Sequence, residues 1–272
     1  MAIPLKDKTI IITGASSGIG AATARACAAA GMNVVLNARR AERLLELKNE
    51  IESVRGGAGA EVVAGDVTDT GISERMLDAA HARFGGFHAV FANAGYGMDK
   101  PMHELSAEDV RKMFEVNVFT GLELLSLAAR RLIADGKPGH LLMCSSILAR
   151  FAIPGHGLYC ATKSAQWQMC RAMRMELRPH RIHVSTVHPI TTVTEFFDVS
   201  SQLSKSTAKP DAGKPVKMPG VFVQPASKVA NAVVKCLRRP RAEVWTTATL
   251  HLLSGIIGLV PATADRFIGR MM

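Results

Sequence analysis

Short apolar runs alternate with longer stretches of helical period along most of the chain, and no other feature constrains the fold as strongly. The apolar runs lie at residues 9–12, 34–36, 62–64, 89–92, 141–143 and 182–187. Apolar residues at helical spacing fill the stretches 21–30, 41–55, 73–84, 107–134 and 158–177 between them. Because parallel strands need a long crossover, usually a helix, this alternation is typical of repeated βαβ units. The sequence therefore predicts an α/β domain of three layers, a doubly wound parallel sheet with helices on both faces.

The chain is predicted to form a single domain, since its 272 residues contain no internal repeat and no low-complexity tract. The regular pattern is lost at about residues 191–225, where polar residues, Pro and Gly surround Phe196, Phe197, Met218 and Phe222. A loop of this length in a compact domain usually serves a function, so we predict a mobile lid that closes over a ligand. An apolar segment follows at about residues 247–272.

The chain carries a formal net charge of +10, with a pI near 9.7. A field of this sign attracts nucleic acid, anionic lipid or an anionic ligand. Nucleic acid is the weakest of the three, because the basic residues are scattered and only two Trp and two Tyr are available for base stacking. An anionic cofactor needs only one or two local cations, and the other charges can be solvated surface.

The cysteines predict neither a disulfide framework nor a metal site. They are odd in number, form no Cys-x-x-Cys pair and have no histidine at metal-ligand spacing; the five are Cys27, Cys144, Cys160, Cys170 and Cys236. Residues 1–9 contain no apolar run of signal-peptide length. We therefore expect a reducing compartment and a cytoplasmic protein.

A glycine-rich string, TGASSGIG at residues 13–20, lies between the first predicted strand and the first predicted helix. Glycines there let the backbone turn sharply and approach a pyrophosphate at the helix N-terminus. The string alone also fits an ordinary tight turn, but its placement at the first strand-to-helix junction favours a bound nucleotide.

The end of the second strand indicates which nicotinamide cofactor fits. An acidic side chain there would bind the ribose 2′-hydroxyl and repel a 2′-phosphate, but this chain has Asn37, Ala38, Arg39 and Arg40. Two guanidinium groups suit bidentate phosphate contacts, so the sequence predicts NADP rather than NAD. The alternative is that both arginines are simply solvated on a loop.

Tyr159 and Lys163 lie four residues apart near the start of a predicted helix, and therefore on one face of it. A free tyrosine titrates near pH 10, and we expect the lysine and the positive helix N-terminus to lower the pKa of Tyr159. The phenol could then act as a general acid or base. A pair at this spacing also occurs as a snorkelling surface pair.

Ser145 and Ser146 follow the strand run at 141–143, at the edge where parallel sheets bind their ligands. A hydroxyl group there can donate a hydrogen bond to a substrate carbonyl. No Gly-x-Ser-x-Gly pattern surrounds the pair, which makes a hydrolase a poor alternative.

Together these motifs resemble those of the classical short-chain dehydrogenase/reductase family, from about residue 6 to about residue 244. The glycine motif of the family is intact at residues 13–20, and its Asn-Ala-Gly turn matches residues 93–95. Ser146 lies 13 residues before Tyr159, the usual interval in the family, which selects Ser146 over Ser145. The resemblance implies a Rossmann fold, a nicotinamide cofactor and a homodimer or homotetramer formed through the long helices.

The resemblance also implies a role for each matching residue. Ser146 would polarise the substrate carbonyl and Tyr159 would transfer the proton. Lys163 would bind the nicotinamide ribose and lower the tyrosine pKa, while Asn117 would hold a water in the proton relay. The cofactor-binding residues implied in the same way are Gly14, Ser16, Ser17, Gly18, Ile19, Gly20, Arg39, Arg40, Asp66, Val67, Asn93, Ala94, Gly95, Tyr159, Lys163, Pro189 and Thr194, with Asp66 on the adenine.

Some positions depart from the family pattern. The family usually has Pro-Gly after the sixth strand, whereas Pro189 is followed here by Ile190. A β-branched residue does not take positive φ at low cost, so we expect the backbone beside the nicotinamide amide to run differently. His156 and His188 flank the predicted site and can contact substrate, although a lone histidine near a loop more often has a structural role.

Residues 250–260 are apolar, interrupted by His251 and Ser254, and follow the basic run RRPR at 238–241. The segment is too short to span a bilayer, which needs about 20 residues. It can form a helix packed on the domain or at a subunit interface. Alternatively, it rests with its basic neighbours on a membrane surface and admits a lipid-like substrate.

The sequence thus predicts an NADP(H)-dependent oxidoreductase that moves a hydride between nicotinamide and a carbonyl or secondary alcohol. The expected substrate is an apolar ketone or aldehyde. Two alternatives stay open, namely a non-catalytic NADP-binding scaffold that senses redox state and a peripheral membrane lipid-binding module.

Overall fold

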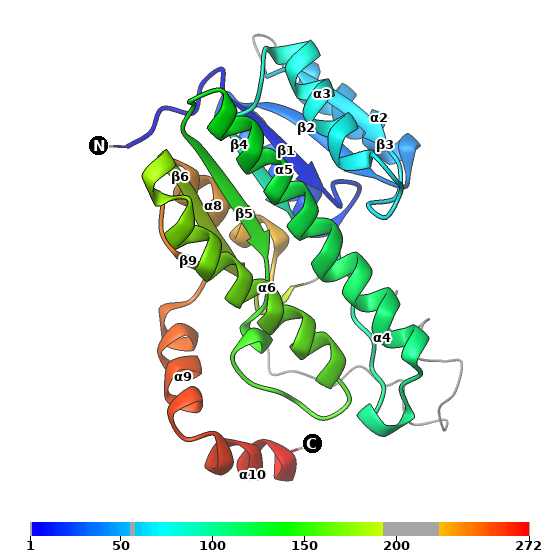
Figure 1. Ribbon diagram of the computed structural model, residues 1–272, viewed down its shortest axis with the longest axis vertical. Helices are drawn as coiled ribbons and strands as arrows, with labels where there is room; N and C mark the ends of the chain where they lie inside the picture. Colours follow the sequence, from blue (N-terminus) through cyan, green and yellow to red (C-terminus); the bar gives the residue numbers. More distant parts are fainter. Residues whose placement is uncertain (1, 55–57, 193–222, 272) are drawn as a thin grey trace.

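A seven-stranded sheet forms the centre of the computed structural model, which describes residues 2–54, 58–192 and 223–271 (Figure 1). Its strands are all parallel, in the order β3-β2-β1-β4-β5-β6-β9. They span Thr9–Thr13 (β1), Asn33–Ala38 (β2), Ala60–Ala64 (β3), Ala89–Ala92 (β4), Gly139–Cys144 (β5), Ile182–His188 (β6) and Glu243–Trp245 (β9). The doubly wound parallel sheet predicted from the alternating pattern is confirmed.

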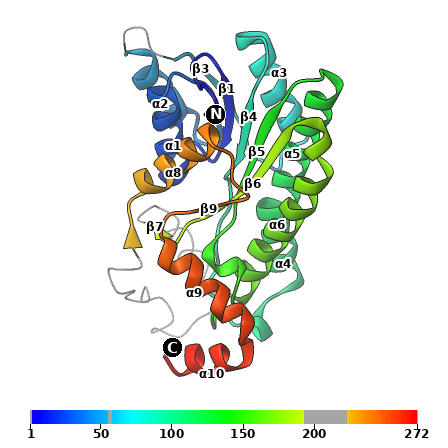
Figure 2. The ribbon, with the colours of Figure 1, turned by 90° about the vertical axis from the view of Figure 1, so that its left-hand side faces the viewer.

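Helices cover both faces of the sheet (Figure 2). One face packs against α1 (Gly18–Ala29), α2 (Ala41–Glu52) and α8 (Ala226–Arg238), and the other against α3 (Ile72–Phe84), α5 (Thr120–Ala134) and α6 (Gly157–Glu176). The remaining helical elements are α4 (Ala107–Phe114), α9 (Ala248–Leu259), α10 (Pro261–Met271) and the short turns η1 (Met102–Glu104), η2 (Glu115–Phe119), η3 (Ile147–Ala149) and η4 (Arg178–His180). The three-layer arrangement follows.

The central strand β1 shows why the strands read as unbroken apolar runs. Successive side chains of a strand point to opposite faces of a sheet. Ile10 and Ile12 accordingly pack into the core under α1, α2 and α8, while Ile11 packs into the core under α3 and α5. All three are fully buried. A parallel sheet covered on both faces therefore favours runs of consecutive apolar residues in its strands.

The helical stretch predicted at residues 107–134 contains a π-helical turn. It begins as α4 with a capping box, in which Ser106 and Asp109 each bind the backbone N–H of the other. The turn η2 then interrupts it before α5 continues. Asn117 and Val118 in η2 are buried.

Two elements were not predicted from the sequence, namely the edge strand β9 and the helix α8, which covers one face of the sheet. The apolar residues of α8 lie on one face, against α1, and β9 has only three residues, with Val244 between two polar or bulky side chains. The sheet therefore has seven strands instead of the six predicted. A separate pair of short strands, β7 (Thr191–Thr192) and β8 (Val223–Gln224), joins the two ends of the predicted lid, whose residues 193–222 lie outside the described part of the chain.

The apolar C-terminal segment forms α9 and α10, which extend beyond the sheet at its carboxyl end (Figures 1 and 2). On α9, Leu250 and Ser254 are buried, and the helix contacts β9 and η3. The opposite side of α9 is exposed, with Leu252 at 69% and Leu259 at 81%. Only one side of α9 therefore packs on the domain, as one of the two sequence-based alternatives expects.

Three histidines lie in one row across the sheet, at the edge opposite the glycine-rich turn. His88 immediately precedes β4, and His140 on β5 pairs in register with His183 on β6. Burial lowers the pKa of His140 to about 3 and that of His88 to about 4, and in both cases the nearby His183 adds to the effect, with Lys8 adding at His88. These imidazoles are therefore neutral in the folded protein near neutral pH.

Lowering the pH from about 7.5 to about 5 is expected to reduce the free energy of unfolding. Histidines of the unfolded chain titrate near 6.5, well above the folded values of about 4 for His88 and about 3 for His140. Between these limits the unfolded chain binds more protons, so stability rises with pH up to about 6.5. Urea unfolding at a series of pH values measures the slope.

The variant His140→Asn is the control, because its side chain takes up no proton in this range. We expect a flatter dependence of unfolding free energy on pH, whatever the absolute loss of stability. An unchanged slope would show that His140 does not carry the effect.

Candidate active site

The glycine-rich turn joins the carboxyl end of β1 to the N-terminus of α1, as predicted. Gly14 and Gly18 adopt left-handed conformations, with φ of 65° and 52°. A Cβ atom on Gly14 would lie 3.0 Å from Nδ2 of Asn93, and one on Gly20 would collide with the carbonyl oxygen of Gly14. The side chain of Ser17 makes no capping hydrogen bond to α1. This narrow backbone cradle at an uncapped helix N-terminus fits the pyrophosphate of a dinucleotide.

The hydroxyl group of Thr13 ties this turn to the Asn-Ala-Gly turn after β4. Its Oγ1 atom accepts hydrogen bonds from the backbone N–H groups of Asn93 and Ala94, over 2.9 and 3.0 Å. The Asn93 side chain donates in return to the carbonyl oxygen of Thr13 over 3.0 Å. A Cβ atom on Gly95 would lie 3.7 Å from Nζ of Lys163. The structure thus brings the two predicted turns together and next to Lys163.

The end of β2 presents two cations beside the same turn. Arg40 donates from Nε and Nη2 to Oγ of Ser16, over 3.2 and 3.0 Å. The Nη1 atom of Arg39 lies 3.7 Å from Oδ2 of Asp66, and the Arg39 side chain is 76% exposed. Asn37 is fully buried and donates to two backbone carbonyl groups in and after β3. Arg40 is therefore directed at the glycine-rich turn, whereas Asn37 is engaged within the sheet.

Asp66 and Val67 follow β3, at the same edge of the sheet. The Oδ1 atom of Asp66 accepts hydrogen bonds from the N–H and hydroxyl groups of Thr68, over 3.0 and 2.9 Å. Val67 lines a small void together with Thr13 and Ala94. Both residues that the family resemblance assigns to the cofactor thus lie near the turn after β1.

Ser146, Tyr159 and Lys163 come together at the carboxyl end of β5. Ser146 precedes η3, and its Oγ atom accepts a hydrogen bond from the N–H of Leu148 over 3.2 Å. Tyr159, in the first turn of α6, shares a side-chain hydrogen bond with Ser146. The Nζ atom of Lys163, one turn further along, lies 5.4 Å from the centre of the Tyr159 ring. The three side chains therefore face one site.

The protonation of this site differs from the expectation. Burial raises the pKa of the Tyr159 phenol, and the hydrogen bond with Ser146 only partly opposes the rise. Burial also lowers the pKa of Lys163 to about 8, although its Nζ atom donates to the carbonyl oxygen of Cys144 over 2.8 Å. The prediction that Lys163 and the helix N-terminus lower the pKa of Tyr159 is wrong for the protein alone, because burial raises this pKa and the hydrogen bond with Ser146 is what acts against the rise.

Asn117 is buried in the π-helical turn η2, and its side chain is fully engaged. Its Oδ1 atom accepts from the N–H of Tyr96 over 2.9 Å, and its Nδ2 atom donates to the carbonyl oxygen of Tyr96 and to Oγ1 of Thr162. The side chain of Gln166 donates to the main-chain carbonyl oxygen of Asn117. Asn117 therefore holds the segment after β4 against α6, and π-helical turns of this kind are frequent at functional sites.

The carboxyl end of β6 runs beside the Ser146 segment. The carbonyl oxygen of Pro189 accepts a hydrogen bond from the N–H of Ile147 over 3.1 Å. Ile190 is buried and does not adopt a positive φ. Thr194 and the four apolar lid residues, Phe196, Phe197, Met218 and Phe222, lie outside the described residues.

The two histidines considered as substrate contacts have different surroundings. His188 is fully buried, with Nδ1 at 2.9 Å from the carbonyl oxygen of Ser146 and Nε2 at 2.9 Å from Oγ1 of Thr186. Nδ1 of His156 lies 3.6 Å from Oδ1 of Asp99. His188 thus has the structural role that a lone histidine more often has.

Sequence reasoning missed Glu243, whose carboxylate lies within reach of His188 and accepts hydrogen bonds from Arg150. The sequence shows only one acidic residue in the short stretch 243–245, just after the basic run at 238–241. That signal is too weak to predict a contact between residues 93 positions apart.

All five cysteines are free and buried. Within the described part of the chain, no cluster of three or more His, Cys, Asp or Glu side chains is arranged to hold a metal ion. Within the same part, no helix is both long and apolar enough to cross a membrane.

This fold and these turns define a Rossmann-type oxidoreductase that uses a nicotinamide cofactor. The family model for short chain dehydrogenases matches residues 8–204, and the chain belongs to that family. It is accordingly an oxidoreductase of the kind that interconverts C=O and CH–OH groups.

Individual relatives differ in the cofactor that they contain. A D-erythrulose reductase of Gallus gallus is 34% identical, over 76% of this chain and 80% of its own. An alcohol dehydrogenase of Thermococcus sibiricus, solved with 5-hydroxy-NADP, is 30% identical with a TM-score of 0.72, covering 87% of this chain and 94% of its own. A family member from Burkholderia phymatum, solved with NAD, shares the fold at a TM-score of 0.83 and 23% identity, covering 93% of both chains.

Proposed function

We propose that the protein is an NADP(H)-dependent reductase that converts an apolar ketone or aldehyde reversibly to the alcohol. The observation that carries the proposal is the meeting of Ser146, Tyr159 and Lys163 beside Gly95, in the turn after β4. The reductive direction is supported by the Gallus gallus relative, which is a reductase.

The three side chains supply what carbonyl reduction needs from the protein. The bound nicotinamide supplies the hydride that adds to the carbonyl carbon. Because burial raises the pKa of Tyr159, its phenol is protonated at neutral pH and can donate that proton to the substrate oxygen. The Ser146 hydroxyl, in contact with the phenol, binds the same oxygen and stabilises the charge that develops on it. Once the proton has left Oη, the Lys163 ammonium stabilises the phenolate.

The same arrangement supports the roles assigned to the other site residues. Lys163 also binds the nicotinamide ribose, since it lies beside Gly95 in the turn after β4. Asn117 fixes the segment that carries this turn against α6, which supports its assignment to holding a water of the proton relay.

Arg39 and Arg40 support NADP over NAD. Arg40 already binds Ser16 in the glycine-rich turn, and Arg39 lies beside it with most of its side chain exposed. Two guanidinium groups at this edge can bind a 2′-phosphate. Neither Asn37 nor Ala38 offers the carboxylate that would bind a free 2′-hydroxyl.

An apolar cluster beside Tyr159 supports an apolar substrate. Met98, Met113 and Leu158 are buried together, and Tyr159 and Tyr96 pack against them. A carbonyl bound at Tyr159 would therefore have its substituent next to hydrocarbon and aromatic surface, which favours apolar groups.

The variant Tyr159→Phe is expected to lower turnover at least tenfold, about 1.4 kcal/mol of barrier, with NADPH affinity little changed. The phenylalanine ring fills the same space but has no proton to transfer. Oxidation of NADPH with a panel of apolar ketones and aldehydes measures turnover, and fluorescence titration measures affinity. Undiminished turnover would remove Tyr159 from the mechanism, and wild-type protein that binds NADPH without turning over any carbonyl would favour a redox-sensing scaffold.

The variant Arg40→Ala is expected to weaken NADPH binding roughly tenfold while leaving NADH binding nearly unchanged, because the 2′-phosphate loses a charge-assisted contact. Titration with each cofactor measures the ratio. Arg83→Ala, which removes an exposed arginine of α3, is the matched control. An equal loss for both cofactors would count against a phosphate contact.

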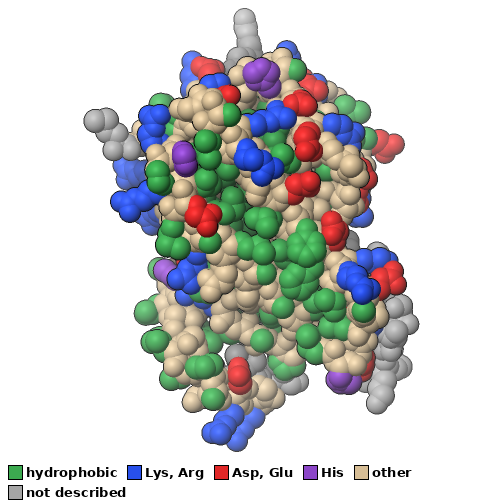
Figure 3. Space-filling model, viewed as in Figure 1, with side chains coloured by type: hydrophobic (Ala, Val, Ile, Leu, Met, Phe, Trp, Pro, Cys, Tyr) green, Lys and Arg blue, Asp and Glu red, His purple; other side chains and the backbone are tan. Residues whose placement is uncertain are grey.

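A homodimer or homotetramer formed through the long helices is also proposed. Phe119 in η2, Ile133 on α5 and Met175 on α6 are exposed. The side of the molecule that carries α5 and α6 faces the viewer in Figure 3, and hydrophobic side chains gather over its middle. Exposed apolar patches of this kind mark interaction surfaces.

Peripheral contact with a membrane is a second candidate function, favoured by the exposed side of α9. Leu252, Leu253, Ile256 and Leu259 are all at least 45% exposed. The adjoining α10 carries Arg266 and Arg270, and the whole chain has a net charge of +10. An apolar helix with basic neighbours binds an anionic lipid surface.

Vesicles of anionic lipid at low salt are expected to carry the protein upward in a flotation gradient, and high salt is expected to weaken this binding. Replacing Leu252 and Ile256 with Asp should reduce flotation strongly. Leu45→Asp, at an exposed apolar position of α2, is the matched control. Equal flotation of both variants, or none of the wild type, would leave the second candidate without support.

A further inference from the structure

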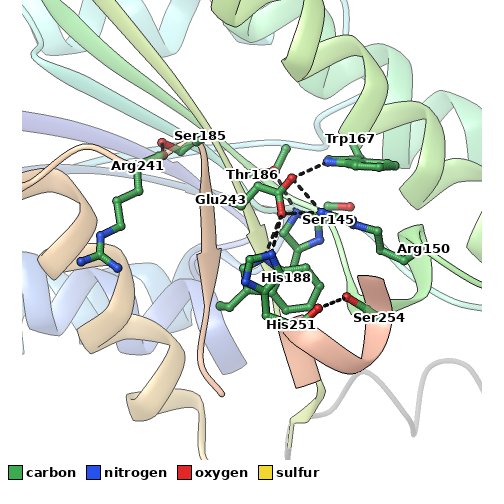
Figure 4. A network of polar contacts seen from close by, with 12 residues as sticks. Ser145, Arg150, Trp167, Ser185, Thr186, His188, Arg241, Glu243, His251 and Ser254 are labelled. Atoms are coloured by element: carbon green, nitrogen blue, oxygen red, sulfur yellow. Dashed lines mark hydrogen bonds and ion pairs between the residues drawn. The ribbon is translucent and has the colours of Figure 1, made fainter. Parts of the chain in front are cut away.

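The carboxylate of Glu243 on β9 collects donors from three separate elements (Figure 4). Arg150, at the end of η3, donates from Nη2 to both oxygens, over 3.0 and 2.7 Å. Trp167 on α6 donates from Nε1 to Oε1, and Trp245 on β9 donates from Nε1 to Oε2, both over 2.9 Å. The side chain of Glu243 is 16% exposed and that of Arg150 is 19% exposed. A single guanidinium nitrogen thus bridges both carboxylate oxygens, and the two indole N–H groups complete the set of donors.

Aromatic stacking fixes the same group from a second direction. The imidazole of His188 stacks on the ring of Trp245 with centroids 4.5 Å apart, and the imidazole of His251 on α9 lies over Trp245 at 4.7 Å. The guanidinium group of Arg150 lies 4.3 Å from the centre of the Trp167 ring. Nε2 of His188 and Nε2 of His251 are 3.9 and 3.8 Å from Oε2 of Glu243.

Glu243 is ionised throughout the ordinary pH range. Burial by itself raises the pKa of this carboxyl group, but the hydrogen bonds from Trp245 and Trp167, with His188 and Arg150 close by, outweigh burial and lower the pKa to about 2. His188 is neutral, since burial lowers its pKa to about 4. Its Nδ1–H therefore donates to the carbonyl oxygen of Ser146, and its Nε2 accepts from the hydroxyl of Thr186.

The cluster called here the Glu243 group consists of Glu243, Trp245, Trp167, His188, His251 and Arg150. This group contacts both ends of the segment that carries the Ser146 hydroxyl. At the start, His188 binds the main-chain carbonyl of Ser146 itself. At the end, Arg150 follows η3 and is held by both oxygens of Glu243. The end of the segment is therefore bound to the carboxylate directly, and its start is linked to it through His188, which stacks on Trp245, a donor to Glu243. A displacement of this segment would carry Ser146 away from Tyr159.

We propose that Glu243 is a positioning residue of the reductase, which holds the segment 146–150 so that the Ser146 hydroxyl meets the Tyr159 phenol. The proposal rests on the proposed function in assigning Ser146 to the substrate carbonyl. Hydrogen-bond donors stabilise a developing oxyanion only when they are held in place beforehand, so a small displacement of Ser146 has a large effect on the chemical step. Arg39, Arg40 and Asp66, proposed for the 2′-phosphate and the adenine, follow β2 and β3, which lie on the far side of β1 from β5. We therefore expect the affinity for NADPH to depend on this segment much less than the chemical step does.

The kinetic test compares Glu243→Gln with Glu50→Gln. The second variant breaks an exposed two-pronged pair with Arg25, far from the site, and controls for loss of an Arg–carboxylate contact. For Glu243→Gln we expect kcat to fall about tenfold while the Kd of NADPH stays within about twofold, and we expect wild-type values for Glu50→Gln. An unchanged kcat, or an equal loss of kcat and cofactor affinity, would overturn the proposal.

A spectroscopic test decides the proposal even if the wild type turns over no carbonyl. The chain has only two tyrosines, Tyr96 and Tyr159, so carbon-13 labelling at Cζ gives two signals, which Tyr159→Phe assigns. We expect Glu243→Gln to move the Tyr159 signal in the same direction as Ser146→Ala and to leave Tyr96 in place. A Tyr159 signal that stays at its wild-type position would overturn the proposal.

The variant Arg150→Gln repeats both measurements in case Glu243→Gln does not fold. It removes the donor at the end of the segment and leaves the carboxylate with its two indole donors. We expect the same changes in kcat and in the Tyr159 signal. A failed reductase assay in the wild type together with a shifted Tyr159 signal would reject the proposed function and keep the positioning role.

Discussion

A single hydroxyl group, that of Thr13, holds together the two turns between which a dinucleotide must lie. The order of the strands reverses between β1 and β4, so the crossovers that follow these strands leave in opposite directions and a crevice forms between them. The crevice is stable only if the backbone N–H groups at its base are satisfied, and Oγ1 of Thr13 accepts two of them. The close approach of Gly14 and Gly20, and the placing of Gly95 next to Lys163, follow from this junction.

Lys163 and Tyr159 lie at the carboxyl edge of the sheet, and burial there shifts the pKa of both groups. Among the described residues, Lys163 makes no ion pair, and its nearest polar partner is the carbonyl oxygen of Cys144. A buried amine whose pKa is lowered to about 8 responds readily to any added negative charge. Formation of a phenolate at Tyr159 supplies such a charge. The buried lysine is therefore poised to gain more from the phenolate than a solvated lysine would.

Local patterns predicted the elements and turns whose residues are close together in the sequence. The apolar runs of β1 to β6, the glycine-rich turn and the spacing of Tyr159 and Lys163 are all properties of short windows, and the sheet and the gathering of Ser146, Tyr159 and Lys163 follow them. The features that the sequence patterns did not predict depend on contacts between distant parts of the fold. The strand β9 has three residues and is defined by its pairing with β6, and the raised pKa of Tyr159 results from burial by distant elements. The π-helical turn η2 could not be predicted either, because the apolar pattern is helical both before and after it.

The Glu243 group links the part of the chain outside the family match to the part inside it. The match ends at residue 204, whereas Glu243 and Trp245 lie beyond it and contact Arg150 and His188 within it. His251 also brings α9 to the same carboxylate, so the helix with the most exposed leucines shares an anchor with the segment that carries Ser146. Anything that shifts α9 must either break its stacking on Trp245 or move Trp245, which donates to Glu243. The contacts of α9 therefore reach the segment that carries Ser146 through Trp245 and the carboxylate of Glu243.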